Sequence, residues 1–164
     1  PCLPRAAAVS ARGLTGGAAA RSPFPTPMLA ALLFDLDGTL VDTNMHHAEA
    51  WARTLAAHGY RIPVERVRLE IGKGGDQLVP ALLGERVDAE EGEALREEVG
   101  EAYRQLVAER GVQLLPGAVQ LLDAVRARGL RTALATSSDD AQLDATLGAA
   151  GVDLRRHVDA TVTK

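Results

Sequence analysis

The 164-residue chain has little cysteine, few aromatic residues and no long apolar run, and its charges are not concentrated in one place. The single cysteine, Cys2, has no partner for an intrachain disulfide, so a reducing compartment is compatible with the sequence. The longest apolar stretch, residues 29–34, is far shorter than the roughly 20 residues that cross a bilayer. Because the net charge of −4 comes from interleaved acidic and basic residues, we expect no nucleic acid and no membrane as partners. A hydrophobic content of 46% is enough for one folded core.

Residues 1–27 contain no acidic residue but include Arg5, Arg12 and Arg21. An acid-free, arginine-containing leader is typical of an organelle transit peptide. However, Met28 stands immediately before the first patterned segment, which favours a non-native or over-extended start with Met28 as the initiator. We therefore expect residues 1–27 to be a disordered leader or a non-native extension. The expected location is cytoplasmic, with organelle targeting as the alternative.

The hydrophobic pattern from residue 29 to residue 112 predicts one strand followed by a block of helices. The nearly unbroken apolar run at 29–36 is typical of a buried parallel strand. Helical spacing follows at 43–58, and two short helices are expected at 64–71 and 76–83. Asp88, with Glu91 three residues later, resembles the start of a longer helix that runs to about Arg110.

After a linker at 111–117 that contains Pro116, the pattern alternates between helices and apolar strands. The segments expected are a helix at 118–128, a strand at 130–136, a helix at 139–150 and a weaker strand at 158–162. This alternation predicts an α/β fold with a Rossmann-like parallel sheet. Residues 28–42 and 113–164 would form this core, which is incomplete, and residues 43–112 would be an inserted small α-helical cap.

The residues with the most chemical information are Asp35, Asp37 and Gly38, which stand where the first strand ends. Ligands bind at that edge of open parallel sheets. Since residues two apart in an extended chain point the same way, Asp35 and Asp37 can converge on one site. Two neighbouring carboxylates beside a phosphate suit Mg²⁺. An acidic turn that merely closes a strand is the alternative interpretation.

The string Asp35-Leu36-Asp37-Gly38-Thr39 resembles the first signature of the haloacid dehalogenase-like hydrolases. The resemblance implies a magnesium-dependent phosphohydrolase that forms an aspartyl-phosphate. Asp35 would be the nucleophile and a metal ligand. Asp37 would be the general acid/base and would offer its backbone carbonyl to the metal.

The second signature of the family is a Ser or Thr at the end of the next strand, and Thr136 and Ser137 occupy that place. By resemblance, Thr136 would bind a phosphoryl oxygen, and Ser137 would supply an alternative donor. On its own, the cluster is more typical of a helix N-cap that leads into Asp139.

The helical insertion resembles the cap of the subgroup that includes phosphoglycolate phosphatases and β-phosphoglucomutases. The resemblance implies a small phosphorylated metabolite as substrate, with either a phosphatase or a phosphosugar mutase activity, and it does not indicate the oligomeric state. Lys73 and Gly74 lie in the expected cap contact loop, and His47 matches a histidine of the mutases. The alternatives are an ordinary exposed lysine and a hinge or surface histidine. Trp51 is expected to pack in the core of the cap.

Two further family elements are missing before Lys164: a lysine beside a proline and an acidic pair that completes the metal site. We therefore expect a C-terminally truncated sequence, and a non-catalytic remnant is a further hypothesis. The missing part would also leave the first strand as an exposed edge that is prone to association.

Overall fold

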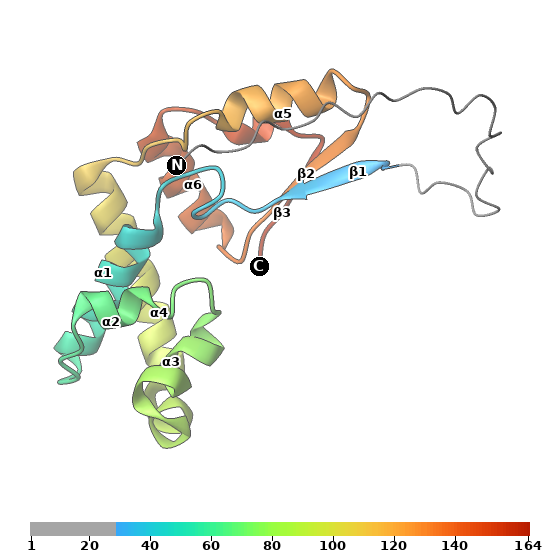
Figure 1. The fold of residues 1–164 in the computed structure, drawn as a ribbon. Coiled ribbons are helices and arrows are strands. Elements are labelled where there is room, and N and C mark those ends of the chain that lie inside the picture. The colour runs from blue at the N-terminus through green and yellow to red at the C-terminus, as the bar shows by residue number, and fades with distance from the viewer. Residues whose placement is uncertain (1–28) are drawn as a thin grey trace, which may run out of the picture.

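The computed structural model describes residues 29–164, so the expectations for residues 1–27 and for Met28 lie outside the described part. The sheet has three parallel strands in the order β1-β2-β3: β1 is Ala31–Phe34, β2 is Arg131–Ala135 and β3 is Ala160–Val162. This arrangement confirms the α/β fold with a parallel sheet (Figure 1). Within the described residues, no helix is both long enough and apolar enough to cross a membrane.

Strand β1 is shorter than the predicted segment 29–36, because residues 29–30 and 35–36 lie outside the strand and the chain turns at residues 38–40. The carbonyl of Leu36 accepts backbone N–H groups from the following turn and pairs with no neighbouring strand. The apolar run therefore contains a strand and the buried anchor of a turn, which periodicity alone does not distinguish.

Four helices separate β1 from the rest of the sheet, and they form the elongated lower part of the molecule (Figure 1). They are α1 (Asn44–Ala57), α2 (Val64–Arg68), α3 (Gly75–Leu83) and α4 (Glu85–Arg110). The predicted start of the long helix at Asp88 is wrong, because the chain breaks at Gly84, whose φ of 87° suits glycine. Asp88 instead forms an ion pair with Arg96, about two turns farther along the same helix.

Helices α5 (Ala118–Arg126) and α6 (Asp140–Ala150) pack on the sheet, and a short 3₁₀ helix, η1 (Leu154–His157), precedes β3. The carboxylate of Asp139 accepts the backbone N–H of Gln142 and caps α6, so the cap is Asp139 and not the Ser/Thr cluster before it. Apolar residues of α5 and α6 cluster with Phe34 and Leu134, so both helices cover the same face of the sheet.

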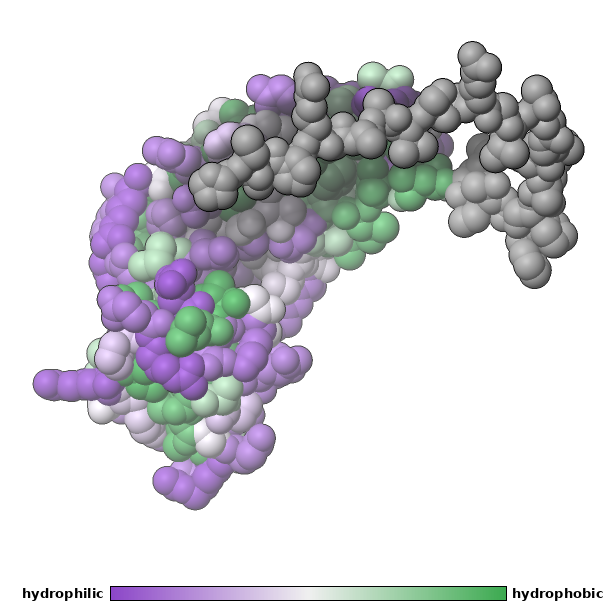
Figure 2. All heavy atoms as spheres, in the orientation of Figure 1, coloured by the Kyte–Doolittle hydropathy of each residue, from purple (hydrophilic) through white to green (hydrophobic). Residues whose placement is uncertain are grey.

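The other face of the sheet is bare within residues 29–164. Apart from Arg131 at the start of β2, its strand side chains are apolar, and Leu33 and Val162 are 71% and 57% exposed. Figure 2 shows hydrophobic side chains at the surface in this region. Parallel sheets are normally covered on both faces, and β1, which pairs with β2 alone, is an edge strand of the described sheet. This edge is the one that the sequence predicts to be exposed.

Two apolar clusters stabilise the molecule, and α4 contributes to both. In the first half of α4, Leu95 packs with Trp51, Leu55 and other residues of α1 to α3. In its second half, Tyr103, together with Leu106 and Val107, packs into the cluster on the face of the sheet that α5 and α6 cover. Trp51 is 7% exposed and lies in the first of these clusters, as expected for a core residue of the helical part.

Candidate active site

The turn after β1 is held by backbone hydrogen bonds and by burial of its apolar side chains. The carbonyl of Leu36 accepts the N–H groups of Thr39 (3.2 Å), Leu40 (2.9 Å) and Val41 (3.1 Å), while the N–H of Gly38 donates to Val41 (2.8 Å). Leu36, Leu40 and Val41 are at most 1% exposed. The polar residues between these anchors therefore have fixed positions.

Two observations favour glycine at position 38, and the backbone conformation is the stronger one. Its φ of +71° lies in the left-handed region, and a Cβ atom there would meet the side chain of Asn44 at 2.6 Å. Farther on, the carbonyl of Leu40 accepts the N–H of Leu115 (2.9 Å). This bond ties the turn to the linker that returns the chain to the sheet.

Asp35 is exposed and follows β1 directly. The hydroxyl of Thr39 donates to its Oδ2 at 2.8 Å. The carboxylate is therefore oriented by one neighbour and remains accessible to a ligand, as a nucleophile must be.

Asp37 is largely buried, and three side chains converge on its carboxylate. The Thr43 hydroxyl donates to Oδ1 at 2.6 Å, and the Ser138 hydroxyl donates to Oδ2 at 3.4 Å. Nε2 of His47 lies 3.1 Å from Oδ1 but makes no hydrogen bond within residues 29–164, because the geometry is unsuitable. Burial is the largest influence and acts to raise the pKa of Asp37, but the contacts with His47, Thr43 and Ser138 outweigh it and lower the pKa.

Thr43 and Ser138 are functional candidates that the sequence analysis did not single out. Thr43 is fully buried and stands at the N-cap of α1, yet its side chain makes no capping bond because the hydroxyl binds Asp37. Ser138 is adjacent to the predicted Ser137. The only signal for Thr43 in the sequence was its place before a helix, which normally indicates a cap.

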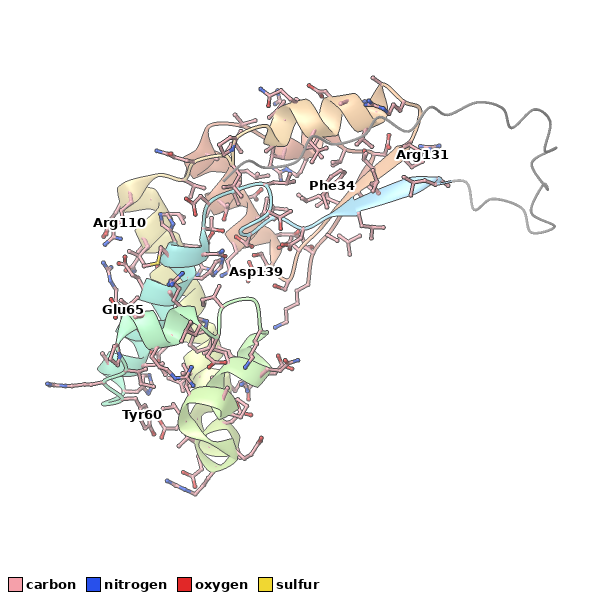
Figure 3. The ribbon with its side chains drawn as sticks, viewed as in Figure 1. Phe34, Tyr60, Glu65, Arg110, Arg131 and Asp139 are labelled. Carbon is pink, nitrogen blue, oxygen red and sulfur yellow. The ribbon has the colours of Figure 1, made fainter. Side chains whose placement is uncertain are left out.

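A pocket of about 260 Å³ joins the end of the sheet to the helical part, and it brings together five of the predicted site residues. The five are Asp35, Asp37, His47, Lys73 and Ser137. Trp51 and Ile71 contribute apolar surface to the same pocket. Phe34 on β1 and Asp139 before α6 mark the two places where the chain leaves the sheet toward this region (Figure 3).

Thr136 and Gly74 are not among the residues that line this pocket. The hydroxyl of Thr136 accepts the N–H of Ser138 at 3.1 Å, and its own N–H donates to Val162 at 3.0 Å. Gly74 lines an adjoining pocket of about 500 Å³, which also contains Arg96 and Lys164. In this conformation Ser137 faces the 260 Å³ pocket, and Thr136 supports the loop behind it.

Lys73 reaches the pocket from the loop between α2 and α3, but its ammonium group already has a partner. It forms an ion pair with Glu70, which also pairs with Arg66. The bonds from Lys73 and then Arg66 lower the pKa of Glu70. Lys73 is thus a tethered cation at the mouth of the pocket.

The oxygen atoms available at the end of β1 fit part of a magnesium site. Mg²⁺ favours oxygen ligands and is often bound by one or two carboxylates together with water and substrate phosphate. Asp35 offers an accessible carboxylate, whereas that of Asp37 accepts hydrogen bonds from Thr43 and Ser138 and lies 3.1 Å from Nε2 of His47. Residues 29–164 contain no group of three or more His, Cys, Asp or Glu side chains placed to hold a metal ion. The described residues can therefore supply only some of the ligands.

Comparison with known proteins gives several similar curated sequences. The protein CbbY of Rhodobacter capsulatus is 34% identical over 127 residues, which are 74% of this chain and 56% of CbbY. A phosphoglycolate phosphatase of Nitrosospira multiformis is 33% identical over 122 residues, which are 72% of this chain and 53% of that enzyme. The chain thus spans about half the length of these curated relatives.

The fold agrees with these sequence relationships. A hydrolase from Pseudomonas syringae of known crystal structure has a TM-score of 0.69 and 30% identity, over 82% of this chain and 60% of that one. The family described as haloacid dehalogenase-like hydrolase matches residues 29–164, which include every described element and the whole candidate site. The chain therefore belongs to the haloacid dehalogenase-like hydrolase family.

Proposed function

We propose that the intact protein is a magnesium-dependent phosphohydrolase that acts on a small phosphomonoester through an aspartyl-phosphate. The observation that carries this proposal is the contrast between the two aspartates of one pocket. Asp35 is exposed and has one hydrogen-bond donor, whereas Asp37 is largely buried and contacted by three side chains. The first arrangement suits attack on phosphorus, and the second suits a carboxylate that must hold and transfer a proton at a fixed point.

In the first step, an oxygen of Asp35 forms a bond to phosphorus while the bond from phosphorus to the ester oxygen breaks. Asp37 in its protonated form would give its proton to the departing oxygen. In the second step, Asp37 would take a proton from water as the water attacks the aspartyl-phosphate, which releases phosphate and restores Asp35. The lowered pKa of Asp37 favours the ionised form, which is the form that the second step requires.

Other residues of the pocket would bind and orient the substrate. Ser137 would hydrogen-bond a phosphoryl oxygen, and Thr136 would keep the Ser137 loop in place or bind phosphate itself after a small rearrangement. Asp35 and the backbone carbonyl of Asp37 would hold Mg²⁺, which supplies positive charge beside the phosphate when it is bound.

The non-phosphate part of the substrate would contact the helical part of the molecule. We assign residues 28–42 and 113–164 to the core and residues 43–112 to the cap, so that His47, Lys73 and Gly74 are cap residues. Lys73 gives the mouth of the pocket a cation that suits an anionic or hydroxylated group. The phosphatase relative named for phosphoglycolate supports a compound of this small size.

Replacing Asp35 with Asn in the full-length protein tests the mechanism. Asp35→Asn should abolish Mg²⁺-dependent release of phosphate and leave the thermal transition unchanged. Asp42→Asn is the matched control, because Asp42 is exposed near the same turn but does not line the pocket. Near-normal turnover by Asp35→Asn, with deamidation excluded by mass spectrometry, would falsify the nucleophile assignment. Product analysis by ³¹P NMR separates free phosphate from the isomerised sugar phosphate of a mutase.

A further inference from the structure

An aromatic side chain from the helical part packs directly against the histidine of the candidate site. The rings of His47 and Tyr103 are stacked with their centroids 4.1 Å apart and an angle of 14° between their planes. His47 belongs to the first turn of α1 and Tyr103 to the second half of α4, 56 residues later, and Tyr103 is 0% exposed. The stack therefore joins two elements that are distant in sequence.

The Tyr103 ring is itself fixed by a hydrogen bond to a third element. Its hydroxyl lies 2.8 Å from the hydroxyl of Thr146 on α6. The Thr146 hydroxyl donates to the carbonyl of Gln142 at 2.9 Å, so it accepts from Tyr103. Burial, followed by the nearby charge of Asp37, raises the pKa of Tyr103, and the phenol therefore stays a neutral donor at ordinary pH. Neither end of the Tyr103 ring can shift without breaking a packed contact.

The plane of the His47 ring decides where its Nε2 atom points, and Nε2 lies 3.1 Å from Oδ1 of Asp37. A histidine ring could rotate about its χ angles if nothing covered its face. Tyr103 covers that face, and the parallel planes allow a small rotation in the common plane but oppose a flip out of it. Thr43 binds Asp37 through its own hydroxyl and is not part of the ring stack.

We infer that Tyr103 is a positioning residue that acts on Asp37 through His47, by holding the imidazole in the plane that keeps Nε2 3.1 Å from Oδ1 of the carboxylate. This inference rests on the proposed function, in which Asp37 transfers protons. It assigns to α4, the helix that packs into both apolar clusters, an indirect influence on the site. Tyr103 itself is not among the residues that line the pocket. It also lies near Thr43 and the charge of Asp37, so the experiment must separate the route through His47 from a route that bypasses it.

A double-mutant cycle in the full-length protein tests the inference, with p-nitrophenyl phosphate as substrate. Tyr103→Leu removes the stack, His47→Ala removes the imidazole, and the double variant removes both. We expect each single change to lower kcat by about tenfold, the scale of one aromatic stack, with little change in KM. If Tyr103 acts through His47, then Tyr103→Leu costs nothing further in the His47→Ala background. Independent, multiplicative losses in kcat would overturn the inference.

Two control variants separate positioning from stability. Tyr103→Phe keeps the stacked ring and loses the hydroxyl that bonds to Thr146, and Thr146→Val removes the other partner of that bond. Both should lower the melting temperature but keep kcat within about twofold of the wild type, because the stack survives. If Tyr103→Leu does not fold, Tyr103→Met provides a longer apolar side chain without a ring. A kcat for Tyr103→Met equal to that of Tyr103→Phe would contradict a role for the ring.

An NMR measurement makes the inference independent of turnover. If the wild type hydrolyses no phosphate ester, the proposed function fails, and the ¹³Cγ signal of Asp37 then becomes the readout. We expect this signal to move by the same amount and in the same direction in Tyr103→Leu and His47→Ala, and to stay in place in Tyr103→Phe. An Asp37 signal that moves in His47→Ala but not in Tyr103→Leu would refute the coupling.

Discussion

Replacing Thr43 with Val removes one hydroxyl from the candidate site and keeps the shape of the side chain. Thr43 is 0% exposed, and its hydroxyl donates to Oδ1 of Asp37 at 2.6 Å. A hydrogen bond to a charged group contributes about 1.5–3 kcal/mol, against about 1 kcal/mol for a neutral one. We therefore expect Thr43→Val to lower the free energy of unfolding by about 2 kcal/mol at pH 7. The helix itself should not suffer from the change, because Thr43 makes no side-chain cap.

The pH dependence of this loss identifies its cause. The pKa of Asp37 is lower in the folded protein than its usual value, so the ionised carboxylate stabilises the fold above its unfolded pKa of about 3.9. That contribution disappears as the pH falls through the folded pKa. Urea unfolding from pH 7 down to below about pH 4 should therefore show the difference between Thr43→Val and the wild type shrinking.

Thr146→Val is the matched control for this experiment. Thr146 is also fully buried, but its hydroxyl binds the uncharged Tyr103 hydroxyl and a backbone carbonyl. Its loss should be about 1 kcal/mol and should not vary over the same pH range. A Thr43→Val loss that is equally independent of pH would refute the argument that the charge of Asp37 makes this bond strong.

Three further changes test other parts of the structure. Gly38→Ala should lower the free energy of unfolding by at least about 1–2 kcal/mol in urea titrations, because of its positive φ and the contact with Asn44; an unchanged midpoint would contradict this. Gly100→Ala should raise it by about 0.5–1 kcal/mol, since an alanine Cβ in α4 meets nothing closer than 3.6 Å; a loss would show that the space is not free. His58 has a raised pKa, first because of its bond to Glu98, so its stabilising effect is complete below about pH 6.5 and is lost as the pH rises through the folded pKa. The melting-temperature difference between the wild type and His58→Asn should shrink from pH 5.5 to pH 9, and a constant difference would refute the pairing.

The alternation of apolar segments was enough to predict the parallel sheet and most helix positions. Strand β2 and helix α6 lie within one or two residues of their predicted bounds, because each is flanked by a strong local signal: Gly129 before β2, and Asp139 and Gly151 around α6. The start of α4 was wrong because two signals competed. An acidic residue followed by Glu91 indicated a cap, but the positive φ at Gly84 decided the break.

The candidate site was only partly predictable, for a physical reason. Asp35 and Asp37 form a local motif, and the end of β2 lies beside them because adjacent parallel strands end at one edge. Tyr103 reaches the site only through the packing of α4 against α1, which no local pattern specifies. The ion pairs of His58 with Glu91 and Glu98 also join different helical elements, so no local pattern predicts them. They lie at the end of the helical part that Tyr60 marks in Figure 3.

The bare face of the sheet has a practical consequence for laboratory work on residues 29–164. A flat array that includes Leu33, Val162 and several alanines has Arg131, at the start of β2, as its one charged strand residue. Such a surface binds amphiphilic dyes such as ANS and detergents, and it promotes concentration-dependent precipitation. Dye fluorescence during thermal unfolding would therefore start high and would not report the transition. Intrinsic fluorescence of Trp51, which is buried in the helical part of the molecule, avoids this background.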